Sequence, residues 1–202
     1  MMEPGRNRGR PPLVDEDDLR ARAIDVLREH GYSAVTMSRI ADEVGVSVRT
    51  LHRYFPAKAD IVWGGIEGSI DALRASLRHA DDRLAPFDAI TAVVVQVFEQ
   101  DADALAVGRA RMRIIATEPN LESTRPETYR QWREETAAFF ARRLGLTPDD
   151  LIPQSAAAAV LAAIMAGIGW WAVQDDETLA PVTAVKRALG GLGAVTGVPA
   201  GP

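Results

Sequence analysis

The chain of 202 residues contains no cysteine, and aromatic residues make up only 6% of it. Without cysteine, disulfide bonds and thiolate-bound zinc are excluded, which fits a reducing compartment. The low aromatic content, together with abundant alanine, leucine and arginine, favours helices over sheets. Since no useful stretch alternates between apolar and polar residues, the sequence predicts an all-α protein.

We do not expect a secretion signal in the opening residues MMEPGRNRGRPP, because they contain no apolar run after their charges. The run from Ala156 to Val173 has 18 residues and no charge, which is the lower limit for a membrane span. Most of these residues are alanine or glycine, which gain little from lipid. We therefore expect a buried packing helix, no membrane contact and a cytoplasmic location.

Signs of catalysis or metal binding are lacking as well. The three histidines, His30, His52 and His79, do not have metal-ligand spacing, and the chain has no zinc-protease, P-loop or nucleophile-elbow motif. Residues 167–172 match G-x-G-x-x-A, but no strand precedes them, and close helix packing explains the glycines better. We expect no enzyme activity, no catalytic residue, no cofactor and no metal.

The charge is unevenly distributed. The formal net charge is −5, so nucleic-acid binding by the whole surface is not expected. Acidic residues are missing from Val44 to Ala59, where Arg49, Arg53 and Lys58 give a local excess of positive charge, and from the arginine-rich stretch Gly5 to Val14. Two cationic segments on an acidic chain predict a focused contact with nucleic acid.

Helical periodicity covers most of the chain, and glycines and prolines divide it into about nine helices. The first four are expected at residues 15–30, 36–44, 47–55 and 57–79. Five more are expected at 86–100, 102–117, 124–144, 153–174 and 179–190. The chain is accordingly divided into a disordered basic arm at 1–14, a three-helix unit at 15–60, a helical body at 61–195 and a tail at 196–202.

Residues 36–55, TMSRIADEVGVSVRTLHRYF, have the form of a helix-turn-helix, with Gly45 in the turn. Val48, Leu51 and Phe55 share one face of the second helix and are expected to anchor it. The other face would be free to enter a major groove about 12 Å wide. It carries side chains that can bond to phosphates or base edges, namely Ser47, Arg49, Thr50, His52, Arg53 and Tyr54.

This segment resembles the TetR family of bacterial transcriptional regulators, and the resemblance extends over residues 15–65. The family's pattern is reproduced by Gly31, Thr36, Ile40-Ala41, Gly45-Val46-Ser47, Leu51, Tyr54-Phe55 and Lys58. The remaining residues match the family only in length, helical content and position.

The resemblance implies roles for single residues. Thr36 would cap the second helix and touch a phosphate, and Arg49 and Thr50 would face bases. Lys58 would contact the DNA backbone from the start of the fourth helix. His52 departs from the family, which most often has a phosphate-binding tyrosine at this position.

The segment Arg8-Gly9-Arg10-Pro11 resembles the core of an AT-hook, a ligand of the minor groove. Its arginines suit the negative potential of a narrow A·T groove. Arg8 and Arg10 are therefore candidate DNA contacts, and a disordered basic tail without a role in binding is the alternative.

Two further functions are expected in the helical body. Ala159, Ala163 and Gly167 recur every four residues and would let another helix approach, so the helices near 153–174 and 179–190 are expected to form a homodimer interface like that of the family. A small, largely hydrophobic effector would bind inside the body, with candidate contacts at Met112, Trp132, Phe139, Met165 and Trp170.

Together these features predict a homodimeric repressor that binds a palindromic double-stranded operator through its two helix-turn-helix units and is released by the effector. Two alternatives remain. One is a regulator that responds to no small molecule, and the other is an enzyme in the helical body with a vestigial DNA-binding unit.

Overall fold

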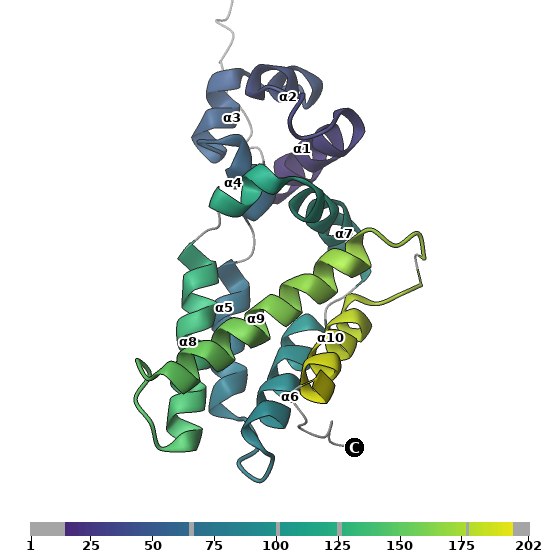
Figure 1. Ribbon diagram of the computed structural model, residues 1–202. Coiled ribbons are helices and arrows are strands. Elements are labelled where there is room, and N and C mark those ends of the chain that lie inside the picture. The colour runs from purple at the N-terminus through teal and green to yellow at the C-terminus, as the bar shows by residue number, and fades with distance from the viewer. Residues whose placement is uncertain (1–14, 65–66, 100–101, 125–126, 177, 196–202) are drawn as a thin grey trace, which may run out of the picture.

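All regular secondary structure is helical in the residues that the computed structural model describes, which are 15–64, 67–99, 102–124, 127–176 and 178–195. This confirms the expected all-α class. Figure 1 shows the elements in chain order, which are α1 (Glu16–His30), α2 (Met37–Glu43), α3 (Val48–Tyr54), α4 (Lys58–Trp63), α5 (Glu67–Arg78), α6 (Pro86–Phe98), α7 (Ala102–Thr117), the 3-10 helix η1 (Pro119–Thr124), α8 (Glu127–Leu144), α9 (Leu151–Ala172) and α10 (Pro181–Val195).

The helix expected over residues 57–79 is two helices, α4 and α5, so the described residues contain ten α-helices rather than about nine. α4 ends at Trp63, and the next residue, Gly64, has an extended backbone with φ −67° and ψ 162°. Gly64 and Gly65 are adjacent in the sequence, and each glycine costs a helix about 1 kcal/mol relative to alanine. The expected helix is thus interrupted where its helix propensity is lowest.

Side-chain caps fix where α2 and α3 begin. The Thr36 hydroxyl accepts a hydrogen bond from the backbone N–H of Arg39 at 3.3 Å, and the Ser47 hydroxyl accepts one from Thr50 at 3.0 Å. The turn between the two helices contains Gly45 with φ 73°, a left-handed conformation that glycine adopts without steric cost. These local interactions place α2 and α3 as the sequence predicts.

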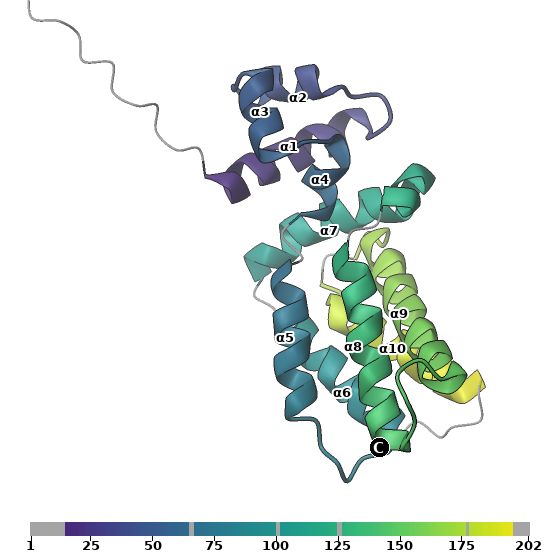
Figure 2. The ribbon, with the colours of Figure 1, turned by 90° about the vertical axis from the view of Figure 1, so that its left-hand side faces the viewer.

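The first four helices enclose a hydrophobic core at one end of the molecule (Figure 2). Residues of the body also enter this core, because α7 and η1 contribute Ile114 and Leu121. α4 contributes Ile61, Val62 and Trp63, so the core extends past residue 60, where the sequence places the domain boundary. α4 and α7 therefore connect the N-terminal unit to the body.

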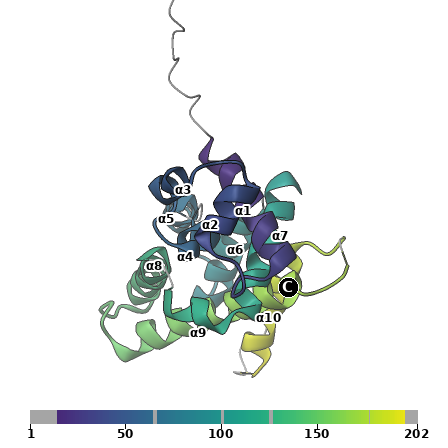
Figure 3. The ribbon, with the colours of Figure 1, turned by 90° about the horizontal axis from the view of Figure 1, so that it is seen from above.

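The other helices form a bundle in which α9 packs against α7, α8 and α10. In Figure 2, α7 runs across the molecule between the N-terminal unit and this bundle. Seen from above, α1 to α4 lie over α5 and α6, while α8 and α9 extend to one side (Figure 3). Since α1 and α4 both contact α7, the N-terminal unit rests on the body through α7.

Among the described residues, α9 is the helix long and apolar enough to cross a membrane, with a mean hydropathy of 1.9. This is weak evidence for a span, because the core helix of a soluble protein passes the same test. In the fold α9 is a packing helix, as expected. At Gly167 an added Cβ would meet the Ala184 carbonyl oxygen at 3.0 Å and the Val185 Cα at 3.1 Å, so this glycine lets α10 of the same chain approach.

Replacing Gly167 by valine is expected to lower the free energy of unfolding by about 1–3 kcal/mol, the usual cost of overpacking. The added side chain would meet backbone atoms of α10, which cannot rotate away as a side chain could. Gly191→Val is the matched control, since Gly191 is exposed on α10 and a Cβ there meets nothing within 4 Å. Equal denaturation midpoints for the two variants would contradict the close packing.

Candidate nucleic-acid interface

α3 lies beside α2 at the end of the molecule away from the bundle (Figures 1 and 2). Leu51 and Phe55 are 0% and 1% exposed and anchor the helix in the N-terminal core. On the other side of the helix, Arg49, His52 and Arg53 are exposed. A short helix with one buried anchor face and one exposed cationic face has the arrangement needed to enter a major groove.

Among the candidate DNA contacts on α3, Arg49 is the one least engaged in contacts within the protein. Across the described part of the chain its guanidinium has no hydrogen-bond or ion-pair partner. Arg53, by contrast, donates to the Tyr54 hydroxyl at 3.2 Å and lies 4.9 Å from the centroid of that ring. The Thr50 hydroxyl is 2.7 Å from that of Ser47. Arg49 can thus bind a base without first breaking an internal contact.

His52 lies at the end of α3 with its Nδ1 3.1 Å from the backbone oxygen of Pro56. A carbonyl oxygen only accepts, so this hydrogen bond requires the proton on Nδ1. In the neutral ring Nε2 is then an acceptor, and it donates to a phosphate only when the ring is doubly protonated. A tyrosine, the family's usual residue here, carries a hydroxyl that donates without a change of charge.

Thr36 and Ser47 use their hydroxyl oxygens to cap α2 and α3. Their O–H groups can still donate to a phosphate oxygen, because a hydroxyl is donor and acceptor at once. Both residues are exposed. The described structure places both at helix starts on the N-terminal unit, and their contact with DNA stays a prediction.

Lys58 is engaged inside the protein. Its Nζ donates to the backbone oxygens of Tyr32 at 2.5 Å and Val35 at 2.7 Å, and it lies 4.4 Å from the Tyr32 ring centroid. Burial lowers the pKa of Lys58, and attraction to the Glu118 carboxylate partly opposes that effect. With two of its three donors used, Lys58 first of all fixes the α1–α2 turn, and its contact with the DNA backbone stays a prediction.

Lys58→Met is expected to destabilise the protein by about 1–2 kcal/mol, because two backbone oxygens lose a charged donor. Because Lys58 is only partly buried, the expected loss in free energy of unfolding is in the lower part of the usual range for a lost charged donor. Lys186→Met on the exposed surface of α10 is the control. Thermal unfolding of both variants provides the measurement, and an unchanged midpoint for Lys58→Met would show that the turn does not depend on this contact.

The end of α4 is held by arginines that the sequence analysis did not single out. Nη1 of Arg20 in α1 donates to the backbone oxygens of Asp60 at 2.7 Å and Ile61 at 3.3 Å. Nη1 of Arg111 in α7 donates to Gly64 at 2.8 Å. Since free carbonyls at a helix C-terminus favour cationic partners, these arginines fix α4 to both the N-terminal unit and the body.

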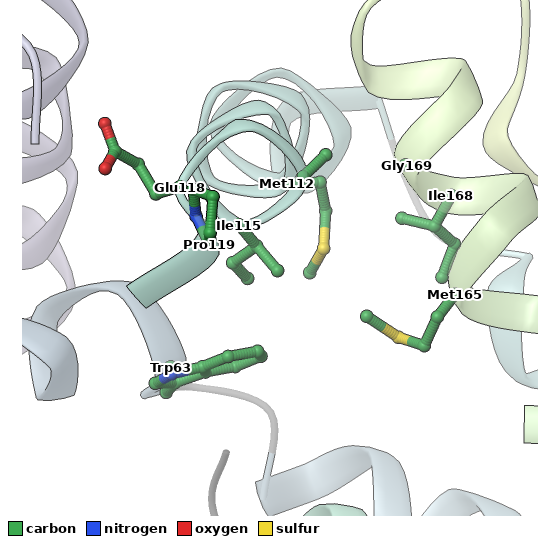
Figure 4. Close-up of a pocket in the computed structure, with 9 residues that line it drawn as sticks. Trp63, Met112, Ile115, Glu118, Pro119, Met165, Ile168 and Gly169 are labelled. Carbon is green, nitrogen blue, oxygen red and sulfur yellow. The ribbon is translucent and has the colours of Figure 1, made fainter. Parts of the chain in front are cut away.

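A pocket of about 350 Å³ lies where α4, α7 and α9 meet, and Figure 4 shows it. Its wall is mostly apolar, and it is formed by Trp63, Met112, Ile115, Ala116, Glu118, Pro119, Met165, Ile168 and Gly169. The volume is at the small end of the range for sites of small molecules.

The five candidate effector contacts do not come together. Met112 and Met165 extend toward one another across the pocket (Figure 4). Trp132 and Phe139 are buried in the core of the body, away from the pocket wall. Trp170 is 46% exposed, with the Arg187 guanidinium 5.7 Å from its ring centroid. Trp63 is a pocket residue that sequence reasoning missed.

One face of α9 is both exposed and free of charge. Its exposed residues follow each other at intervals of three or four and are Leu151, Ser155, Ala158, Ala162, Ala166 and Trp170. Leu151 is 82% exposed. We call this face the α9 stripe. Contiguous exposed apolar surface of this kind is typical of protein interfaces.

The remaining candidates are the arginines of the N-terminal arm and possible metal ligands. Arg8 and Arg10 fall within residues 1–14, outside the described residues. Over the ranges that the structure describes, no group of three or more histidine, aspartate or glutamate side chains is placed to hold a metal ion.

Comparison with known proteins agrees with this arrangement. Residues 19–62 match the family model of the bacterial regulatory proteins of the tetR family, and residues 84–195 match that of the MftR C-terminal domain. The chain is 31% identical over 172 residues to MftR of Mycobacterium tuberculosis, a protein provisionally named as a transcriptional regulator of mycofactocin biosynthesis, with 85% of this chain and 86% of that protein covered.

The chain is also similar to two further proteins. TcmR of Streptomyces glaucescens, a transcriptional regulator of the helix-turn-helix type, is 25% identical over 87% of this chain and 81% of its own. The crystal structure of the repressor FadR of Thermus thermophilus, in complex with lauroyl-CoA, aligns with a TM-score of 0.54, 14% identity and coverage of 93% and 97%, which shows the shared fold. The matched models and the MftR relative together establish that the chain belongs to the TetR family of DNA-binding transcriptional regulators.

Proposed function

We propose that this regulator is a cytoplasmic repressor that binds a palindromic operator as a homodimer, with one α3 in each of two successive major grooves. The observation that carries the proposal is the exposed face of α3, on which Arg49 has no competing partner in the described residues. Two half-sites about one helical turn apart would follow from the twofold symmetry of the dimer.

The α9 stripe supports dimerisation through α9 and α10. An isologous interface needs a surface complementary to itself, and a row of small side chains allows two helices to approach closely. The stripe lacks the charges that interface cores also lack. We assign dimerisation and effector binding to the body and DNA binding to the N-terminal unit, with α4 and α7 as the connection.

The pocket between α4, α7 and α9 is the proposed effector site. The Trp63 indole N–H donates to the Thr124 hydroxyl at 3.0 Å, and the Glu118 carboxylate accepts from Ser33. Because these polar groups are already paired, the pocket offers a bound molecule mainly apolar surface. FadR of Thermus thermophilus was crystallised with lauroyl-CoA, which supports an effector with an apolar part.

A gel-shift titration against the DNA that flanks the chain's own coding region tests the proposal. We expect retardation of a discrete fragment by two chains at concentrations that leave random DNA free, followed by release when a hydrophobic effector is added. Equal affinity for flanking and random DNA would rule out an operator in that region. A retarded species with one chain would rule out the dimer.

A further inference from the structure

The turn between α1 and α2 is held by two side chains from outside the helix-turn-helix. The Ser33 hydroxyl donates to the Glu118 carboxylate at 2.8 Å, and Lys58 binds the backbone oxygens of Tyr32 and Val35. This turn leads directly into Thr36, the cap of α2. Any movement of Glu118 or Lys58 would therefore act on the start of the DNA-reading unit.

Both side chains lie in, or directly after, a helix that forms the pocket. Glu118 follows the last residue of α7 and lines the pocket itself, while its carboxylate points away from the other labelled side chains in Figure 4. Lys58 begins α4, whose last residue, Trp63, forms part of the pocket wall. The α1–α2 turn thus contacts one residue of the pocket wall, Glu118, and the first residue of α4, the helix whose other end forms part of that wall.

The contacts of Glu118 and Lys58 differ in how readily they would transmit a movement. Lys58 lies on α4, whose C-terminal end is held both by Arg20 of α1 and by Arg111 of α7, so movement of α4 relative to either unit is restricted. Glu118 directly follows α7, which packs against α9 of the body. The Ser33–Glu118 hydrogen bond joins the two sides of this boundary over 85 positions of sequence.

We propose that filling of the pocket is transmitted to the DNA-reading unit through the Ser33–Glu118 hydrogen bond, which ties the end of α7 to the turn that precedes Thr36. A molecule between Met112 and Met165 separates α7 from α9, and the end of α7 carries Glu118 with it. Glu118 is a positioning residue in this scheme. The inference rests on the proposed role of the pocket as the effector site.

The test fills the pocket by mutation, so that no effector has to be known. Gly169→Leu adds a side chain at the α9 wall, where a Cβ meets only Ala116 Cβ at 3.5 Å. Ala116→Leu fills the same pocket with a larger side chain on α7, and it serves as the second variant in case Gly169→Leu does not fold. Each is combined with Ser33→Ala, and amide hydrogen exchange of residues 32–38 is measured in the full chain without DNA.

We expect each filling substitution to change exchange in the α1–α2 turn by at least about fivefold, the lower end of ordinary coupling between sites. In the Ser33→Ala background the same filling substitution should change the amide exchange of the α1–α2 turn by less than about twofold. Ser33→Thr, which keeps the hydroxyl, should restore the full response. A purely structural Ser33 would alter the baseline exchange but not the response to filling.

Two outcomes would overturn the inference. One is an equal response to filling with and without the Ser33 hydroxyl, which would assign the coupling to α4 alone. The other is the absence of any response in the turn of the otherwise unaltered chain. Neither depends on DNA, so failure of the proposed repressor function, read from the gel shift, is distinguished from failure of this coupling.

Discussion

Ala162→Glu is expected to separate the proposed dimer into monomers and to weaken operator binding by about 10²- to 10⁴-fold, the advantage that linking two binding units ordinarily provides. Ala162 is exposed at the middle of the α9 stripe. A glutamate there would be buried without a partner once two stripes meet, and an uncompensated buried charge costs about 3–5 kcal/mol. Because the symmetry places the substitution twice in one interface, the effect exceeds that of a single rim contact.

Sedimentation equilibrium gives the dimer dissociation constant, and a gel shift gives the operator affinity. Ala75→Glu is the matched control, since Ala75 is an exposed alanine on α5 and receives the same charge. The control should remain dimeric and bind the operator as before. A dimeric Ala162→Glu variant would contradict the stripe as an interface, and α10 alone would then have to be examined.

The N-terminal unit could be predicted from the sequence because its signals are local. Thr36 and Ser47 are hydroxyl residues just before apolar periodic segments, and both cap helices in the structure. Leu51 and Phe55 follow helical spacing and are buried. Each of these positions is determined by neighbours within a few residues, which is the distance over which capping and periodicity act.

The pocket proposed as the effector site could be predicted only in part, because it depends on contacts between distant segments. Aromatic and methionine residues in the body do not reveal by their type which of them face a cavity. Met112 and Met165 do line the pocket, whereas Trp132 and Phe139 fill the core. Trp63 lies in a segment that the sequence analysis assigned to a long helix, so its place in the pocket wall followed from the break at Gly64 and could not be foreseen.

The contacts that fix α4 to α1 and to the α1–α2 turn were missed for a related reason. Charged residues are read from sequence as solvated, yet Arg20 is only 8% exposed and Lys58 is turned toward backbone oxygens. A signal existed for Arg20, because it stands four residues before Ile24 on the buried face of α1. No such signal existed for Lys58, whose partners lie 23 and 26 positions away.

Arg49→Ala is expected to weaken binding of the dimer to its operator by about 2–6 kcal/mol, which corresponds to roughly 30-fold up to about 10⁴-fold. A bidentate arginine–guanine pair is worth about 1–3 kcal/mol of discrimination, and a symmetric dimer loses one pair in each half-site. Binding to random DNA should fall far less, because there Arg49 acts as one cation among several. Titrations of both DNAs over a range of salt concentrations separate these terms.

Arg133→Ala on α8 is the matched control, since Arg133 is also exposed and lies in the body. It removes the same charge without changing the face of α3, so operator and random DNA should respond to it equally and weakly. If Arg49→Ala also lowered both affinities equally, Arg49 would be a phosphate contact, and base reading would pass to Thr50 and Arg53. Base reading by Arg53 requires its guanidinium to leave the Tyr54 ring. The change in tyrosine fluorescence on DNA binding therefore also distinguishes base reading by Arg53 from base reading by Arg49.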